Sequence, residues 1–311
     1  MSKLLFFTDP HIKGVSPANR IDNYTDSLFA KFQEIGKIAK KEEVEYIICG
    51  GDLFDVPTVS LNVANRFITE IESWDIPFHT VIGNHDCVMS DNKNGLLPYT
   101  IDRSSKINLL NVIETIDSFI VGDSYFFGIE ERNKGMGLDI KDRLQTKLQK
   151  IKQKYKILVT HSNILDKPGH PSMPHVVYTD IDCNYDLVLI GHYHLYCGVK
   201  EYNGTKFVWI GALSRGTIAQ SDLNRIPKVL IIDTETQKLK EIELKSAKPV
   251  EEIFDLSKLN ERKESEKKLE DFIMSIQDIN FKSMNLRERI EEVGKSNKIE
   301  SNIMDEITRR L

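Results

Sequence analysis

Residues 83–86, Gly-Asn-His-Asp, directly follow the apolar run 78–82, Phe-His-Thr-Val-Ile. A turn at the end of a buried strand explains the glycine and the asparagine, but it does not require an imidazole and a carboxylate as well. Four other apolar runs end in the same kind of residues: Asp9-Pro10-His11, Gly50-Gly51-Asp52, Thr160-His161-Ser162 and Gly191-His192-Tyr193-His194. Because the carboxyl ends of parallel strands lie along one edge of a sheet, we expect these polar residues to converge there.

The composition is that of a globular protein. The chain has 311 residues, of which 40% are hydrophobic and 29% charged, so it can form one large domain or a large one with a smaller one. No run approaches the roughly 20 apolar residues of a membrane span, and the N-terminus lacks a cleavable signal, so we expect a cytoplasmic protein with no membrane partner. The net charge of -5 argues against a globally basic nucleic-acid binder but leaves a local patch open.

The four cysteines, at positions 49, 87, 183 and 197, show no CxxC spacing. Neither a disulfide framework nor a thiolate zinc site is therefore indicated.

Short β-branched or aromatic runs alternate with helix-period stretches over residues 1–250, which predicts a layered α/β domain with central mixed β-sheets flanked by helices. The predicted helices are 24–41, 60–74 and 140–154. The predicted strands are 4–8, 46–49, 78–82, 108–112, 119–121, 125–129, 157–160, 187–190, 207–210 and 229–232. The tight spacing after residue 106 indicates antiparallel pairing, and residues 233–236 predict a hairpin.

Residues 257–311 differ in composition from the rest of the chain. They hold 12 Lys or Arg and 12 Asp or Glu, no proline, and helix-spaced apolar residues such as Leu269, Phe272 and Ile276. We expect a small helical C-terminal appendage that serves as a partial cap or as a docking segment for a partner.

Seven of the polar side chains at the strand ends offer oxygen and nitrogen donors but no sulfur: Asp9, His11, Asp52, Asn84, His161, His192 and His194. Such donors suit a pair of divalent ions such as Mn²⁺, Fe²⁺ or Zn²⁺ and suit a structural tetrahedral zinc site poorly. Seven ligands are too many for one ion, and Asp52 can bridge two ions because a carboxylate can give one oxygen to each. Two such ions can clamp a phosphoryl oxygen, which favours phosphoester hydrolysis.

In the order and type of these motifs, from Asp9 to His194, the chain resembles the calcineurin-like metallophosphoesterase superfamily. Residues 50–55, Gly-Gly-Asp-Leu-Phe-Asp, and 212–217, Ala-Leu-Ser-Arg-Gly-Thr, further resemble its DNA-repair nuclease branch, represented by SbcD and its phage relatives. The resemblance implies two groups of metal ligands, with Mn²⁺ as the first choice of metal. One group is Asp9, His11, Asp52 and His194, and the other is Asp52, Asn84, His161 and His192.

The resemblance also implies that His85 contacts the phosphate or protonates the leaving oxygen, with Asp86 orienting its ring. The expected function is the DNA exonuclease or endonuclease subunit of an SbcCD-like repair or recombination complex. Its partners would be DNA, an SbcC-like coiled-coil ATPase and a second copy of the chain. The alternatives are a phosphoesterase for small substrates, such as a cyclic-nucleotide phosphodiesterase or a phosphomonoesterase, and a binding module without catalysis.

The sequence leaves the roles of several other residues open. Asp55 stands where many members of the nuclease branch have a histidine, a departure that favours a small substrate. His79 is expected to be a packed or partly exposed ring within a strand, whereas His170 and His175 lie in a loop that begins close to His161 and are candidates for substrate contact. Arg215 is equally suited to holding phosphate or to capping a helix. The lysine-rich stretch 141–156 is expected to be a solvated helix face, with contact to DNA as the minority alternative.

Overall fold

The computed structural model describes residues 2–57, 59–86, 110–113, 118–129, 151–172, 174–278, 290–291, 294–295 and 299–309. The chain divides into two compact units, Met1–Phe254 and Asp255–Leu311. Its described residues place two six-stranded sheets in the first unit, together with a two-stranded pair, β8 (Ile164–Leu165) with β9 (Val176–Val177).

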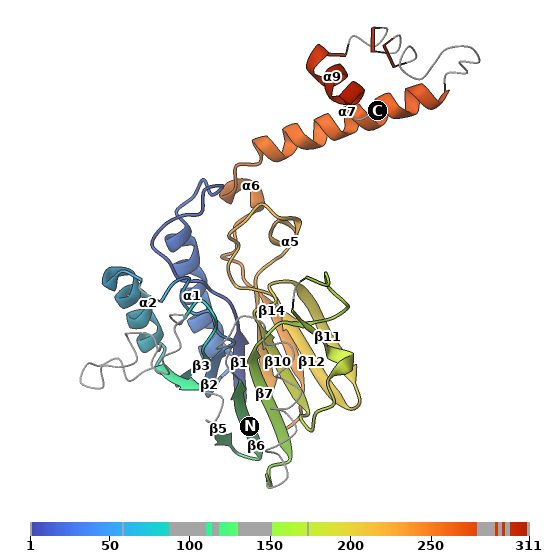
Figure 1. The fold of residues 1–311 in the computed structure, drawn as a ribbon. Coiled ribbons are helices and arrows are strands. Elements are labelled where there is room, and N and C mark those ends of the chain that lie inside the picture. Colours follow the sequence, from blue (N-terminus) through green and yellow to red (C-terminus); the bar gives the residue numbers. More distant parts are fainter. Residues whose placement is uncertain are drawn as a thin grey trace. The chain divides into compact units, whose positions relative to one another are not determined.

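The first sheet has the strand order β14-β13-β1-β2-β3-β4. Figure 1 shows its strands β1, β2 and β3 side by side. Its parallel strands are β1 (Lys3–Phe7), β2 (Tyr46–Cys49), β3 (Phe78–Val81) and β4 (Leu110–Ile113). The strands β13 (Lys228–Asp233) and β14 (Leu239–Glu243) form the expected hairpin, and β13 runs antiparallel to β1. The expectation of antiparallel pairing was wrong for β4, because it pairs in parallel with β3. The sheet is therefore mixed, as predicted.

The second sheet is also mixed and has the order β11-β12-β10-β7-β6-β5. Its strands are β5 (Ser118–Val121), β6 (Ser124–Ile129), β7 (Tyr155–His161), β10 (Leu187–Gly191), β11 (Tyr196–Tyr202) and β12 (Thr205–Ile210). The four central strands run parallel, and β5 and β11 pair antiparallel at the two edges. The carboxyl ends of β7 and β10 therefore lie together at one edge of the sheet.

The main hydrophobic core joins the two sheets to the helices α1 (Tyr24–Lys41) and α2 (Leu61–Ser73). Helix α1 begins after Asn23, whose side chain accepts a hydrogen bond from the Asp26 N–H, and it buries an apolar stripe that includes Phe32. The Phe32 ring meets Phe67 of α2 with 4.9 Å between ring centroids. A smaller cluster, with Trp209 fully buried, packs beside β10 and β12. Burial on both faces explains why the parallel strands read as nearly continuous apolar runs.

The described part of the first unit also contains three short helical turns: the 3-10 turn η2 (Tyr178–Asp180), α5 (Gln220–Leu223) and α6 (Val250–Ile253). The second unit contains the helices α7 (Ser257–Asp278) and α9 (Ser301–Arg309), in agreement with the predicted helical appendage. Within it, Ile290 is buried against Ile299, Met304 and Ile307. The helix predicted at 140–154 lies outside the described residues except for 151–154, which form no helix. Among the described helices, none combines the length and the apolar character needed to cross a bilayer.

His79 of β3 is a packed ring, 9% exposed, and burial lowers its pKa from 6.5 to about 4. The folded protein therefore binds fewer protons here than the unfolded chain between these two values, and stability is lost as the pH falls from 6.5 towards 4. We expect the wild type to lose about 2 kcal/mol at pH 5 through this group, relative to pH 7.5. Urea denaturation of His79→Leu in EDTA should show a correspondingly weaker pH dependence. The matching variant at the exposed His170 should behave as the wild type, and an unchanged pH dependence in His79→Leu would contradict the assignment.

Candidate metal centre

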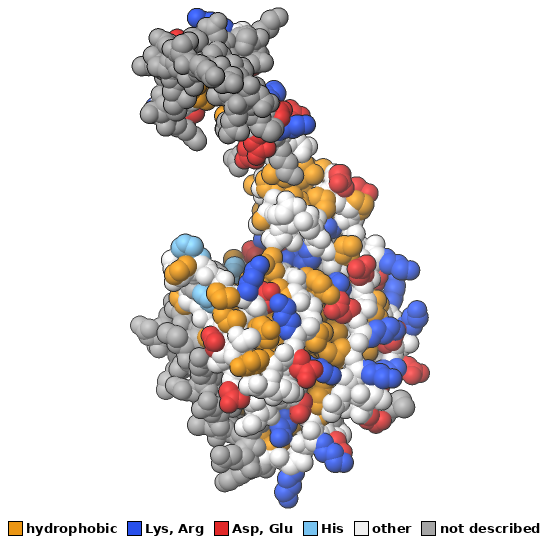
Figure 2. All heavy atoms as spheres, turned by 90° about the vertical axis from the view of Figure 1, so that its right-hand side faces the viewer, with side chains coloured by type: hydrophobic (Ala, Val, Ile, Leu, Met, Phe, Trp, Pro, Cys, Tyr) orange, Lys and Arg blue, Asp and Glu red, His pale blue; other side chains and the backbone are white. Residues whose placement is uncertain are grey.

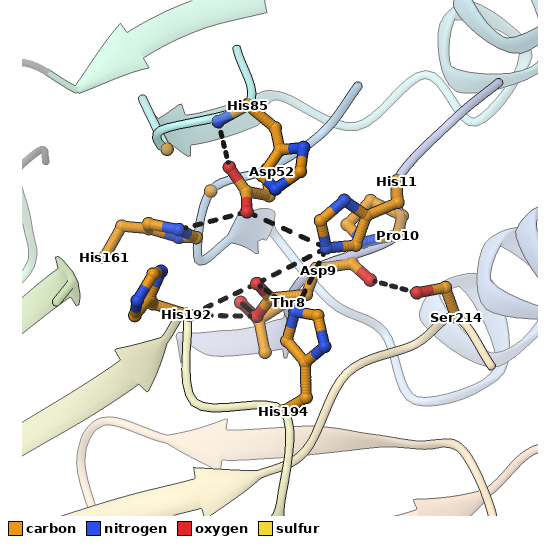
Figure 3. Close-up of polar contacts among 12 residues, drawn as sticks. Thr8, Asp9, Pro10, His11, Asp52, His85, His161, His192, His194 and Ser214 are labelled. Carbon is orange, nitrogen blue, oxygen red and sulfur yellow. Dashed lines mark hydrogen bonds and ion pairs between the residues drawn. The ribbon is translucent and has the colours of Figure 1, made fainter. Parts of the chain in front are cut away.

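The seven donors expected from the sequence come together at the carboxyl ends of five strands. Figure 3 shows all of them except Asn84. Asp9 and His11 follow β1, Asp52 follows β2, and Asn84 follows β3. His161 is the last residue of β7, and His192 and His194 follow β10. β1, β2 and β3 are parallel in one sheet, and β7 and β10 are parallel in the other. The polar residues that follow the strands of both sheets therefore lie close together.

One group of donors consists of Asp9, His11, Asp52 and His194, whose ligand atoms all lie within 4.8 Å of one another. The Nε2 atoms of His11 and His194 are 3.1 Å apart. His194 Nε2 lies 3.4 Å from Asp9 Oδ1, and His11 Nε2 lies 3.7 Å from Asp52 Oδ2. The two carboxylates are buried, whereas the side chain of His194 is 44% exposed, so the group opens to solvent on the His194 side.

The second group consists of Asp52, His161 and His192, again with ligand atoms within 4.8 Å of one another. Asn84 joins this group, because its Oδ1 lies 3.2 Å from His161 Nε2 and 3.0 Å from His192 Nδ1. His161 Nε2 is 3.3 Å from Asp52 Oδ2, the oxygen that also faces His11. One carboxylate is thus common to both groups, which is the geometry of a candidate dinuclear metal site.

The protonation pattern of His161 tests whether a cation fits. Its Nδ1 lies 2.8 Å from the Gly50 carbonyl oxygen, which can only accept, so Nδ1 carries a hydrogen and Nε2 faces the oxygens of Asp52 and Asn84. Burial acts to lower the pKa of His161, but the charge of Asp52 and the hydrogen bond to it outweigh burial and raise the pKa to about 10. Without metal, a proton on His161 Nε2 therefore lies between this nitrogen and the oxygens of Asp52 and Asn84. A metal cation fits the same position.

The charges of the other donors also favour a cation. Burial acts to raise the pKa of Asp9, but the hydrogen bond and the charge of His194 hold it well below its usual range. The pKa of Asp52 is likewise lowered, because the charge of His161 outweighs burial. Burial, followed by the charge of His161, lowers the pKa of His192 to about 4, so this ring is neutral and able to act as a ligand. The residues present therefore fit a pair of divalent metal ions.

Four residues of the site have a left-handed backbone conformation, which residues other than glycine rarely adopt. They are Asp9, His11, Asp52 and His192, with φ of 51°, 49°, 48° and 74°. Such conformations cost free energy and persist only where the surroundings enforce them. Around Asp9 this is done by hydrogen bonds from Thr8 Oγ1 (2.6 Å) and the His192 N–H (3.1 Å) to its Oδ2. At Gly83 a Cβ atom would lie 2.1 Å from Asp52 Oδ1, so only glycine fits beside the carboxylate.

His85 presents an exposed ring next to His11, with the two ring centroids 4.8 Å apart. The expectation that Asp86 orients this ring was wrong. The Nδ1 of His85 lies 2.8 Å from the Asp55 carbonyl oxygen, while the buried Asp86 carboxylate accepts the N–H groups of Leu53, Phe54 and Gly83 at 3.2, 2.9 and 3.0 Å. Burial and the nearby charge of Asp52 raise the pKa of Asp86 to about 7. Asp86 thus ties the loop after β3 to the loop after β2, and its position next to His85 in the sequence does not reveal this.

Two further residues had no assigned place in the site on sequence grounds. Asp55 Oδ1 lies 3.4 Å from His11 Nδ1 and accepts a hydrogen bond from Lys13 at 3.1 Å. Ser214 donates from its hydroxyl to the Asp9 carbonyl oxygen at 3.0 Å. For Ser214 the signal was its place in the segment 212–217, which was noted only for its family resemblance.

Three other candidates make hydrogen bonds to residues outside the donor groups. Arg215 is buried, 4% exposed, and donates to the Lys248 carbonyl oxygen, so it is neither a phosphate contact nor a helix cap. His175 Nε2 accepts the Gly169 N–H at 3.1 Å within its own loop. His170 Nδ1 lies 2.7 Å from the Ser172 hydroxyl, also within that loop.

The role found for Asp86 can be tested by Asp86→Asn. The amide keeps the size of the side chain but places an NH₂ group against backbone donors, so we expect a loss of about 1–3 kcal/mol in the free energy of unfolding. The matched variant His85→Ala, at the exposed neighbour, should change stability by less than about 0.5 kcal/mol. Urea denaturation in EDTA measures both, and equal stability of the two variants would refute the assignment.

The sequence matches the family model of the calcineurin-like phosphoesterases over residues 2–196. Among curated proteins it is similar to the DNA double-strand break repair protein Mre11 of Saccharolobus solfataricus, with 28% identity over 132 residues, which make up 42% of this chain and 33% of that protein. It is also similar to Mre11 of Sulfolobus acidocaldarius, with 24% identity over 196 residues, 62% of this chain and 49% of that protein. The chain thus spans between a third and a half of the length of these relatives.

Among solved structures, TT1561 of Thermus thermophilus is similar with 14% identity and a TM-score of 0.47, covering 78% of this chain and 98% of that chain. A putative 5'-nucleotidase from Staphylococcus aureus has the same identity and TM-score and covers 78% of this chain and 52% of that chain. The family match extends over most of the first unit and includes every donor of the two groups. The chain belongs to the calcineurin-like phosphoesterase family and is a metal-dependent phosphoesterase.

Proposed function

We propose that this chain is a two-metal phosphodiester hydrolase that acts on DNA, as the nuclease subunit of an SbcCD-like repair or recombination complex. The observation that carries the two-metal part is the Asp52 carboxylate common to two converging groups of donors. The DNA part is supported by the similarity to proteins named for DNA double-strand break repair and by the segments 50–55 and 212–217.

In this proposal Asp9, His11, Asp52 and His194 hold one ion, and Asp52, Asn84, His161 and His192 hold the other. Two divalent ions bound there supply positive charge for the phosphoryl oxygens and lower the pKa of a water molecule. We take Mn²⁺ as the physiological metal, because oxygen and nitrogen donors without sulfur suit it, and Fe²⁺ and Zn²⁺ are the alternatives.

The contribution of His85 follows from the hydrogen bonds that fix it. Its Nδ1–H donates to the Asp55 carbonyl, and its backbone N–H donates to Asp52 Oδ1 at 2.8 Å. The remaining ring nitrogen, Nε2, is then available on an exposed side chain beside His11. When the ring carries a second proton, on Nε2, it can donate a hydrogen bond to a phosphoryl oxygen or pass that proton to the leaving oxygen.

A phosphoesterase for small substrates is the second candidate, and two observations favour it. Asp55 places a carboxylate beside His11, and its negative charge repels a polyanionic DNA strand. On the face shown in Figure 2, basic and acidic side chains are interspersed. Ion pairs among the described residues include Lys228–Glu241 at 3.0 Å and Lys240–Glu42 at 2.8 Å. Such pairing leaves fewer cations for phosphate contacts along a strand.

The proposed assembly includes an SbcC-like ATPase and a second copy of the chain. The C-terminal segment 257–311, which contains α7 and α9, is the proposed docking segment. Their balanced charge and the buried contacts of Ile290 suit a small helical unit that presents a surface to a partner.

Purified protein supplied with Mn²⁺ should be offered linear duplex DNA, single-stranded DNA and a chromogenic bis-phosphoester. We expect cleavage of DNA as well as of the chromogenic compound, measured by gel electrophoresis and by absorbance. Activity on the chromogenic bis-phosphoester alone would refute the nuclease proposal and favour the second candidate.

His85→Ala tests the role of the ring. Removing it should lower kcat on the chromogenic substrate by about 10²–10⁴-fold, because a positioned acid is lost, while both ions remain bound. The matched variant His170→Ala, at an exposed histidine in another loop, should keep full activity. Steady-state kinetics together with metal analysis by mass spectrometry measure the two effects, and an active His85→Ala protein would contradict the assignment.

A further inference from the structure

The segment 211–217 follows β12 and makes hydrogen bonds to the main chain at the first group of donors. The Ala212 N–H donates to the His194 carbonyl oxygen at 3.1 Å, and the Leu213 N–H donates to the Thr8 carbonyl oxygen at 2.8 Å. The N–H and the hydroxyl of Ser214 both donate to the Asp9 carbonyl oxygen, at 3.3 and 3.0 Å. One loop therefore holds the main chain of two donor residues that are 185 positions apart in sequence, Asp9 and His194.

Arg225 joins this loop to His194. The side chain is 5% exposed, and its Nη1 donates to the His194 carbonyl oxygen at 2.6 Å. Its Nη2 donates to the Ser214 carbonyl oxygen and, at 2.8 Å, to Asp222 Oδ1. A guanidinium has several donors in a fixed plane, and here they bridge three chain segments at once.

Asp222 completes the connection from the other side. It is 6% exposed, and its Oδ2 accepts hydrogen bonds from the Gly216 N–H, the Thr217 N–H and the Thr217 hydroxyl at 3.0, 2.8 and 2.9 Å. Its two oxygens thus fix the far end of the loop and the guanidinium of Arg225. Both charges of this pair are buried, so the pair is costly to break and rigid while it is intact.

We propose that Arg225 and Asp222 are positioning residues for one of the two metal ions, the one held by Asp9, His11, Asp52 and His194. The inference rests on the two-metal centre of the proposed function. Arg225 sets where the His194 main chain lies relative to the Asp9 main chain, and a metal ion needs both side chains at fixed distances. Residues that orient metal ligands in this way contribute about 10–100-fold to metal affinity.

The other group is held by different bonds. His161 is oriented by the Gly50 carbonyl oxygen, and Asp52 accepts the His85 N–H. The hydrogen bonds of Arg225 go to His194, Ser214 and Asp222, none of which belongs to that second group. The effect of losing Arg225 should therefore fall on one ion and leave the other nearly unchanged.

The chain contains a matched control in Arg20 and Asp22. Arg20 is also buried, 9% exposed, and binds both oxygens of Asp22 at 2.7 and 2.8 Å. Its Nη1 donates to the Arg215 carbonyl oxygen of the same loop at 2.7 Å, but within the described part of the chain it makes no hydrogen bond to a donor residue of the site. A substitution at Arg20 thus carries a similar folding cost without the proposed link to the metal.

The test is calorimetric titration of metal-stripped protein with Mn²⁺, comparing the wild type, Arg225→Lys and Arg20→Lys. Lysine keeps the charge but cannot make three planar hydrogen bonds. We expect two ions to bind the wild type, one of them about 10–100-fold more weakly in Arg225→Lys, and both unchanged in Arg20→Lys, although both variants melt at lower temperature. If Arg225→Lys does not fold, Asp222→Asn tests the same link with the guanidinium retained.

Double variants identify the affected ion. In a His194→Ala background the ion in question is already lost, so adding Arg225→Lys should not weaken the remaining ion further. In a His161→Ala background, adding Arg225→Lys should still lower the affinity for the ion that remains.

Equal weakening of both ions by Arg225→Lys, or the same loss in Arg20→Lys, would overturn the inference. Fewer than two ions on the wild type would instead refute the metal centre itself, and the inference with it.

Discussion

The Asp52 carboxylate is the constraint on which the site depends. It follows the second strand of the first sheet, yet its Oδ2 lies between His11 of that sheet and His161 of the other. Two sheets must therefore pack in one relative position for the two donor groups to share an oxygen. The large core between them, in which fully buried residues of both sheets meet, supplies that rigidity. The hydrophobic packing and the chemistry are thus parts of one arrangement.

Around the donors lies a layer of buried hydrogen bonds that is as specific as the donors themselves. Asp86 ties together the loops after β2 and β3, and the Arg225–Asp222 pair ties the loop after β12 to that after β10. Each of these buried side chains makes its hydrogen bonds largely to backbone groups. It therefore fixes the path of a loop rather than contacting substrate.

The fold and the convergence of the donors were predictable, because both follow from periodicity and from the rule that parallel strands end at one edge. The two mixed sheets, the hairpin after β13 and the packed ring of His79 were confirmed. The parallel pairing of β4 was not predictable from its short, isolated run. The partners of Asp86, Asp55 and Arg225 were not predictable either, since they are backbone groups or side chains far away in the sequence.

The left-handed backbone at Asp9, His11, Asp52 and His192 affects how substitutions at these positions must be interpreted. Alanine is strained at such φ values, so an alanine replacement combines the loss of a donor with a conformational penalty. Asparagine tolerates this region well and has nearly the size of aspartate. An asparagine at position 9 or 52 therefore removes the negative charge with little backbone cost, and the difference between the two replacements separates electrostatics from geometry.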